Sequence, residues 1–131
     1  MNPAVAAVFD AYPAPLRARL MRLRSLIYEA AEATDGVGAL EEMLKWGQPS
    51  YLTPETGSGT TVRIDRDKRS GEPTIYVNCQ TDLLSRYREL YPDGFRFDGD
   101  RGVVVGPGAD EAALKHMIAL ALTYHSAKRR A

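Results

Sequence analysis

The side chains best suited to bind a ligand are predicted to lie on one face of a β-sheet. Residues 61–65 and 74–79 alternate apolar and polar residues with period two, which is typical of strands with one buried face. If Val62, Ile64, Ile75 and Val77 face the core, the residues on the other face are Arg63, Asp65, Tyr76 and Asn78. An arginine, an aromatic ring and an amide on one surface suit a small polar ligand or a peptide segment.

The only tryptophan, Trp46, is predicted to stand at a bend beside the same surface. It precedes Gly47, which permits unusual φ angles, and Pro49, which favours extended geometry at the residue before it. We expect the predicted ligand-binding residues to be Trp46, Tyr51, Arg63 and Tyr76. The alternative is structural: Arg63, Asp65 and Tyr76 then interact only with one another across the strands and keep the sheet face hydrated.

Residue types that carry nucleophilic or acid–base catalysis are present, but their settings do not form a catalytic group. Cys79 is in phase with Ile75 and Val77 and is expected in the core, as free cysteines usually are. His125 falls on the apolar stripe of the last predicted helix, and Ser50 lacks a Gly-x-Ser-x-Gly context. We therefore assign no catalytic residue and expect a protein that acts by binding.

Carboxylates near two turns provide an alternative, a metal site. Asp93, Asp98 and Asp100 are close in sequence, and hard cations prefer oxygen ligands. The same Asp-Gly pairs are also what tight turns require. The sequence therefore predicts no cofactor, with iron as the alternative, and leaves metal ligands unassigned.

These residues need a sheet backed by helices to position them. Asn2-Pro3 is expected to begin a short helix ending near Ala11, and apolar residues recur at helical spacing from Pro13 or Pro15 to Ala33 and again over 110–126. Polar segments at 66–73 and 98–101 are predicted hairpin loops, and Thr81 is expected to cap a short helix through Tyr91. This order predicts an α+β fold, an antiparallel β-sheet with the N- and C-terminal helices packed on one face.

Composition limits the expected partners and location. The length fits a single domain, residues 1–131, and the 17 basic and 17 acidic residues cancel. No overall field therefore favours nucleic acid or an anionic membrane, and no apolar run approaches the ~20 residues that span a bilayer. With a single cysteine and no secretory pattern at Met1-Asn2-Pro3, we expect a cytoplasmic protein with neither a nucleic-acid nor a membrane partner.

Three segments together resemble the YdhG-like domains, a family catalogued as of unknown function. They are residues 23–27 (Leu-Arg-Ser-Leu-Ile), the stretch from Glu41 through Trp46-Gly47-Gln48-Pro49-Ser50 to Tyr51, and residues 124–129 (Tyr-His-Ser-Ala-Lys-Arg). The resemblance extends from about Pro13 to Arg129. It implies a compact α+β domain, similar to the frataxin-like sandwich, with no established catalytic residues.

Two functions follow from the residues and the resemblance. The first is binding of a small polar ligand or a protein segment on the open sheet face, and the sequence leaves open whether another subunit covers that face. The second comes from relatives described as frataxin-like intracellular iron chaperones. In that alternative, surface carboxylates such as Asp93, Asp98 and Asp100 bind Fe(II) weakly.

Overall fold

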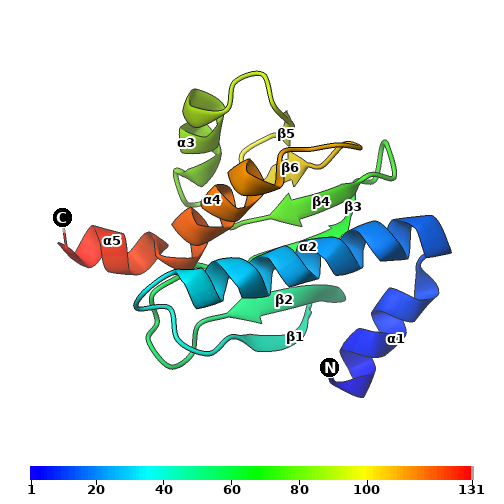
Figure 1. The fold of residues 1–131 in the computed structure, drawn as a ribbon, viewed down its shortest axis with the longest axis horizontal. Helices are drawn as coiled ribbons and strands as arrows, with labels where there is room; N and C mark the ends of the chain where they lie inside the picture. The colour runs from blue at the N-terminus through cyan, green and yellow to red at the C-terminus, as the bar shows by residue number, and fades with distance from the viewer. Residues whose placement is uncertain (131) are drawn as a thin grey trace.

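The computed structural model describes residues 1–130, and these residues confirm the predicted α+β fold (Figure 1). The helices and strands are, in chain order, α1 (Pro3–Ala11), α2 (Ala14–Ala33), β1 (Glu41–Lys45), β2 (Gln48–Leu52), β3 (Val62–Arg66), β4 (Pro73–Tyr76), α3 (Leu83–Leu90), β5 (Arg96–Asp98), β6 (Gly102–Val104), α4 (Glu111–Leu122) and α5 (Tyr124–Arg130). The described strands form a sheet in the order β1-β2-β3-β4-β6-β5, in which every neighbouring pair is antiparallel.

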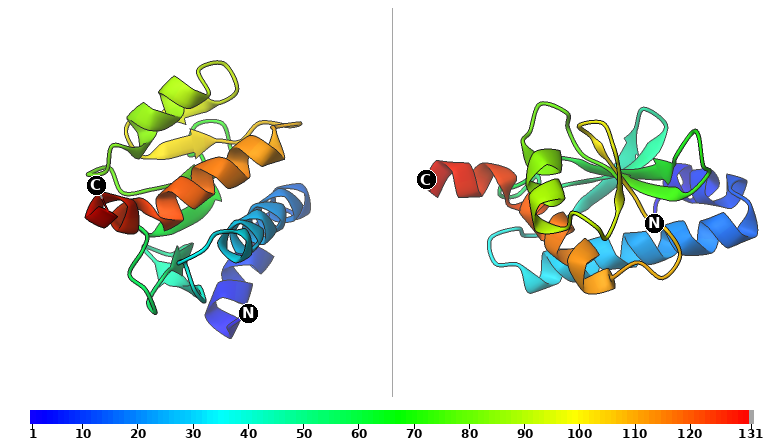
Figure 2. Two further views of the ribbon diagram at one scale, coloured as in Figure 1. Left: turned by 60° about the vertical axis from the view of Figure 1, so that its left-hand side comes forward. Right: turned by 90° about the horizontal axis from the view of Figure 1, so that it is seen from above.

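Helices α2 and α4 lie side by side across one face of the sheet (Figures 1 and 2). Both helices turn an apolar stripe toward the sheet, because residues three and four apart share one face of a helix. The buried residues of these stripes and of the facing strands include Leu20, Leu23, Ile27, Val62, Ile64, Ile75, Val103, Leu114, Met117 and Ile118. The opposite side, which carries Arg63, Tyr76 and Asp98, is called the open face below.

The bend at the tryptophan is a two-residue hairpin turn between β1 and β2. Lys45 pairs with Gln48, and the two residues between them have positive φ angles, 56° at Trp46 and 73° at Gly47. Two successive positive φ angles are the signature of a type I′ turn, which matches the twist of the strands that it joins. Glycine adopts this conformation freely, whereas a bulky side chain there is strained.

Helix α1 begins as the sequence predicts. The Asn2 side chain accepts a hydrogen bond from the Val5 amide at 2.8 Å and so caps the helix. Val5 and Phe9 bury their side chains in the core, and α1 packs beside β1 and β2. Within residues 1–130, no helix is both long enough and apolar enough to cross a membrane.

The predicted single helix over 110–126 is wrong at its end, because it breaks at Thr123 into α4 and α5. The loop before β3 causes the break. The Ser58 carbonyl accepts from the amides of His125 and Ser126 at 2.8 and 3.0 Å, and the Ser58 hydroxyl donates to the Leu122 carbonyl at 2.7 Å. His125 consequently leaves the apolar stripe and is exposed.

Candidate functional site

The strand register places a row of residues straight across the open face. Arg63 of β3 pairs with Tyr76 of β4, Tyr76 pairs with Gly102 of β6, and Gly102 pairs with Asp98 of β5. Gly102 has a steric role in this row, since a Cβ atom there would lie 3.4 Å from the Tyr76 ring and 3.0 Å from the Asp98 Cβ atom. The missing side chain leaves room for the tyrosine ring beside Gly102.

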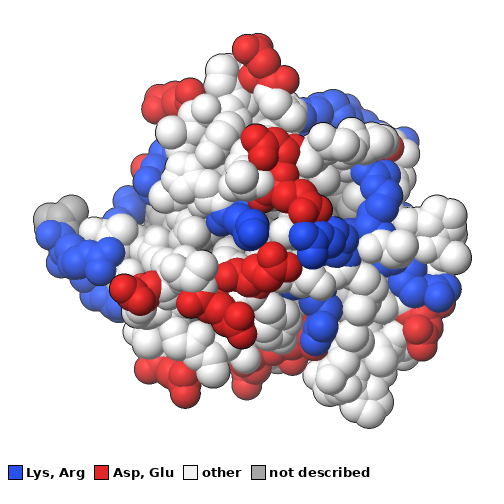
Figure 3. All heavy atoms as spheres, viewed as in Figure 1, with Lys and Arg blue, Asp and Glu red and all other residues white. Residues whose placement is uncertain are grey.

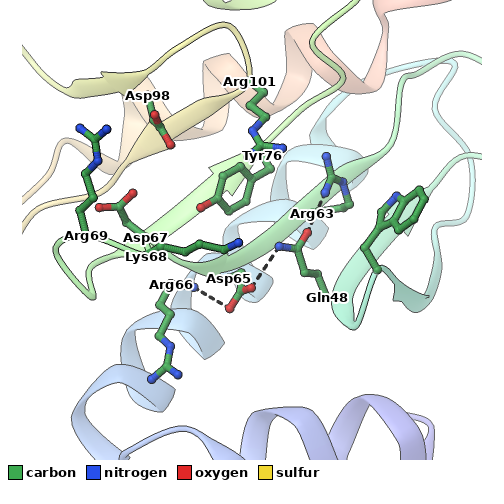
Figure 4. Close-up of a pocket in the computed structure, with 11 residues that line it drawn as sticks. Gln48, Arg63, Asp65, Arg66, Asp67, Lys68, Arg69, Tyr76, Asp98 and Arg101 are labelled. Atoms are coloured by element: carbon green, nitrogen blue, oxygen red, sulfur yellow. Dashed lines mark hydrogen bonds between the residues drawn. The ribbon is translucent and has the colours of Figure 1, made fainter.

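A hollow of about 600 Å³ lies over this row (Figure 4). The sheet forms its floor, and the β3–β4 loop and the β5–β6 turn form its walls. The residues that line it are Trp46, Gln48, Arg63, Asp65, Arg66, Asp67, Lys68, Arg69, Tyr76, Asp98 and Arg101. A volume of this size falls within the range of small-molecule sites, whereas the predominantly charged lining points to a polar ligand.

Two arginines flank the ring at the centre of the hollow. The guanidinium carbon of Arg63 lies 5.9 Å from the Tyr76 ring centroid, and that of Arg101 lies 5.8 Å from it. Both distances allow a cation–π attraction. The backbone of Arg101 is held in place, since its carbonyl accepts from the Val77 amide at 2.8 Å. Figure 4 shows the two guanidiniums at the same end of the tyrosine ring.

A chain of hydrogen bonds fixes the floor beside Arg63. Arg63 Nη1 donates to Gln48 Oε1 at 2.7 Å, and Gln48 Nε2 donates to Asp65 Oδ2 at 3.0 Å (Figure 4). The other Asp65 oxygen accepts from the Tyr12 hydroxyl at 2.6 Å, which ties the site to the end of α1. The Asp65 carboxylate is therefore engaged by neutral donors and makes no direct bond to Arg63 within the described chain.

The buried carboxylate of Asp67 forms hydrogen bonds within the β3–β4 loop and to β5. This group accepts from the amide and hydroxyl of Ser70 at 2.9 and 2.8 Å and from Arg96 at 3.2 Å. Hydrogen bonds from Ser70 are the main cause that lowers the pKa of Asp67, so the carboxylate stays ionised. The wall that carries Lys68 and Arg69 is thereby held against the sheet.

Burial and neighbouring charges shift the pKa values of Arg63 and Tyr76. Burial is the larger cause that lowers the pKa of the Arg63 guanidinium from its ordinary value, and the neighbouring charge of Arg101 is the second. Burial raises the pKa of Tyr76, helped by the negative charges of Asp67, Asp65 and Asp98. Tyr76 therefore presents a neutral hydroxyl at physiological pH.

Three of the four predicted binding residues meet at this hollow, namely Trp46, Arg63 and Tyr76. Trp46 is 89% exposed, so its indole stands at the rim with little packing against the rest of the protein. Tyr76 is 6% exposed and forms part of the floor. The structure places these three residues around one hollow, and their binding of a ligand stays a prediction.

The predicted position of Tyr51 at the rim of the open face is wrong, because this residue lies on the opposite face of the sheet. It pairs with Val62, a core residue, and is fully buried. Its hydroxyl donates to Glu42 Oε2 at 2.8 Å, and Glu42 in turn accepts from Arg24 of α2 at 2.6 and 3.1 Å. Residues two apart in a strand lie on the same face, so Gln48 and Ser50 of β2 share the face of Arg63, and Tyr51 lies on the other. Gln48 therefore lines the hollow and Tyr51 does not.

Sequence reasoning missed Gln48, Arg101 and the cationic loop residues Lys68 and Arg69. Gln48 carried no local signal for its face, because that face follows from the pairing of Ser50, two residues further along the strand, with Arg63. Arg101 carried none, because it lies in a turn that reaches Tyr76 only through the pairing of β4 with β6. This pairing skips α3 and β5 in the chain order.

Of the residues considered for catalysis or metal binding, Asp98 lines this hollow and Cys79 lies beside it, in a neighbouring pocket that Arg63 and Arg101 also line. Cys79 is exposed rather than buried, because β4 ends at Tyr76 and the alternation does not continue to it. His116 lies on the surface, where its Nδ1 atom is 2.6 Å from the Tyr91 hydroxyl. Asp93, Asp98 and Asp100 are exposed, and in residues 1–130 no group of three or more His, Cys, Asp or Glu side chains is arranged to hold a metal ion.

The helix-covered face has a different charge pattern. Basic and acidic side chains alternate over it (Figure 3), and its arginines form ion pairs. Arg22 bonds Glu111 at 2.7 Å and Glu29 at 3.2 Å, and Arg19 bonds Glu72 at 3.0 Å. Arg19 and Arg22 of α2 are therefore surface ion-pair partners, in contrast to the two arginines beside Tyr76.

No protein-family model, curated protein or solved structure matches this chain.

Proposed function

We propose that this protein binds a small polar ligand in the hollow of its open face, with Trp46, Arg63 and Tyr76 in contact with the ligand. The observation that carries the proposal is the hollow itself, about 600 Å³ of space over the central strands of the open face. Tyr76 in its floor is paired on both sides, with Arg63 of β3 and Gly102 of β6. Its polar groups converge on one volume, as they do in ligand sites. Its size and its walls favour a small molecule over an extended protein segment.

The conformation of Trp46 gives independent support. A left-handed backbone conformation costs a non-glycine residue roughly 1–2 kcal/mol, and burial of the indole does not offset this cost. Strained residues persist where the surroundings or a function maintain them. A large exposed ring at the rim of a polar hollow is suited to stack on a flat part of a ligand.

The test is a screen by amide-resolved NMR of the ¹⁵N-labelled full chain against mixtures of sugars, amino acids, nucleosides and their phosphorylated forms. Compounds that bind are expected to shift the amides of Trp46, Arg63 and Tyr76 together, and the Trp46 indole signal with them. Arg63→Gln should weaken the binding while the melting temperature stays close to that of the wild type. Hits that map only to other surfaces, or a short peptide that outcompetes every small molecule, contradict the proposal.

A further inference from the structure

The two arginines beside Tyr76 lack the carboxylate partners that four other arginines of the described chain have. Arg19, Arg22, Arg24 and Arg96 each contact a carboxylate within 4 Å. Within residues 1–130, neither Arg63 nor Arg101 forms an ion pair, and the side-chain bond that Arg63 makes goes to the neutral oxygen of Gln48. Both guanidiniums nevertheless lie within 6 Å of one ring centroid.

The nearby carboxylates do not neutralise this pair. Asp65 is held by Tyr12 and Gln48, and Asp67 by Ser70 and Arg96. Asp98 lines the same hollow but lies beyond ion-pair distance of both arginines. In total the hollow is lined by five basic residues (Arg63, Arg66, Lys68, Arg69 and Arg101) and three acidic ones (Asp65, Asp67 and Asp98), a surplus of two positive charges. The whole chain has a net charge of zero, so positive charge is concentrated at this site.

Two like charges held close together on a partly buried floor repel each other, and an anion between them removes that repulsion. The planar guanidinium fork matches the oxygen geometry of carboxylates and phosphates and can bind either in bidentate fashion. The number of charges separates the two ligand classes. A phosphate monoester carries about −1.5 to −2 at neutral pH and can compensate both arginines, whereas one carboxylate compensates one.

We infer that Arg63 and Arg101 bind the phosphate group of a small phosphate monoester above the Tyr76 ring. The remainder of the ligand extends through the hollow toward Trp46. This inference rests on the proposed function, since it names the chemical class of the ligand that the hollow takes. Gln48 has a positioning role, because its amide orients Arg63 and separates it from the Asp65 carboxylate.

The test compares three probes of similar size and different charge: glucose, gluconate and glucose 6-phosphate. They are titrated into the full chain while the side-chain Nε–Hε signals of the arginines are followed by NMR. Glucose 6-phosphate should shift the Arg63 and Arg101 signals and bind at least tenfold more tightly than gluconate, and glucose should leave both signals unchanged. The affinity for the phosphate should fall as sodium chloride is raised, since the attraction is electrostatic.

The second part of the test measures the affinity of variants for glucose 6-phosphate. Arg63→Gln and Arg101→Gln should each weaken glucose 6-phosphate binding at least tenfold. The matched control is Arg129→Gln, which removes the same charge from exposed α5 and should leave the affinity unchanged. The Nε–Hε measurement on the wild type does not depend on the folding of any variant.

The outcomes separate this inference from the proposed function. If gluconate or glucose binds the open face as tightly as glucose 6-phosphate, or if phosphate binds with the Arg63 and Arg101 signals unmoved, the phosphate inference is wrong and the proposed function stands. If neither these probes nor the wider screen perturbs the open face, both are wrong. Selective binding of glucose 6-phosphate that both Arg→Gln variants abolish supports both.

Discussion

At the scale of single residues, the Glu42 carboxylate is a buried acidic group that is stabilised by hydrogen bonds from other side chains. Its side chain is 7% exposed and contacts two donors, Arg24 from α2 and Tyr51 from β2. Burial by itself raises the pKa of Glu42, but hydrogen bonds from Arg24 and Tyr51 outweigh this effect and hold the pKa below its usual value. The buried anion therefore depends on both donors.

Replacing Tyr51 with Phe should lower the free energy of unfolding by about 2 kcal/mol, because it removes a hydrogen bond to a charged group and leaves Glu42 with one donor side chain fewer. Urea denaturation at pH 7 measures the change. The matched control is Tyr76→Phe on the open face, which should cost less than about 1 kcal/mol. Equal losses in the two variants would argue against a special role for the Glu42 bond.

At Trp46, in contrast to Tyr51, we expect a substitution to increase the stability of the protein. Asn adopts left-handed geometry more readily than Trp and is favoured in type I′ turns, so Trp46→Asn should stabilise the protein by about 1 kcal/mol. Trp46→Ala keeps a Cβ atom in the strained conformation and should bring no such gain. Thermal and urea unfolding of the three proteins measure this. A loss of stability in the Asn variant would show that the indole itself stabilises the hairpin.

At the scale of secondary structure elements, the loop before β3 determines where α4 ends. A Cβ atom on Gly59 would lie 2.6 Å from both the Cα and the carbonyl oxygen of Leu122. This close approach places Ser58 where it accepts from the amides at the start of α5. The kink between α4 and α5 is therefore a packing feature of the loop against the helix.

Gly59→Ala should consequently lower the free energy of unfolding by about 1–3 kcal/mol, because backbone atoms of Leu122 cannot move aside as a flexible side chain could. Gly94→Ala is the control, since a Cβ atom there meets no atom within 4 Å. Its effect should stay within about 0.5 kcal/mol. Chemical denaturation measures the free energy of unfolding of both variants. A Gly59→Ala variant as stable as Gly94→Ala would mean that the loop can move away from α4.

At the scale of the whole molecule, the bonds of Glu42 join α2, β1 and β2 and make stability depend on pH. The folded pKa of Glu42 is lowered, so its contribution is complete above the unfolded value of roughly 4.3 and is lost as the pH falls through the folded pKa. The free energy of unfolding should therefore decrease as the pH falls below about 5.

Glu42→Gln should have a shallower decrease in that pH range, because the variant no longer binds a proton at this position on unfolding. Glu41→Gln, at the exposed neighbouring residue, should follow the wild-type curve. Urea melts at a series of pH values measure the slopes. Parallel curves for the wild type and Glu42→Gln would exclude Glu42 as a main source of acid sensitivity.

Much of the fold could be predicted because local patterns coincide with long-range packing. The alternation in residues 61–65 and 74–79 gave the correct faces for Arg63 and Tyr76, and the Asn2-Pro3 start gave the first helix. The predictions for Cys79 and His125 failed for a common reason: each lies near the end of an element, where the phase of a periodic pattern depends on where the element stops. The prediction for Tyr51 failed because no alternation fixed its face, which follows from its pairing with Val62. The resemblance to YdhG-like domains and the iron-chaperone alternative stay predictions.

The sequence by itself determined the element types, the antiparallel hairpins and the placing of an arginine and a tyrosine on one sheet face, since these depend on residue periodicity and turn chemistry. Only the tertiary structure decided that Arg101 joins them. Its turn reaches Tyr76 through the pairing of β4 with β6, two strands separated in the chain by α3 and β5. Such a pairing depends on how the whole core packs, which no local pattern encodes. The clustered positive charge of the open face is therefore a property of the folded protein, because the sequence as a whole is neutral.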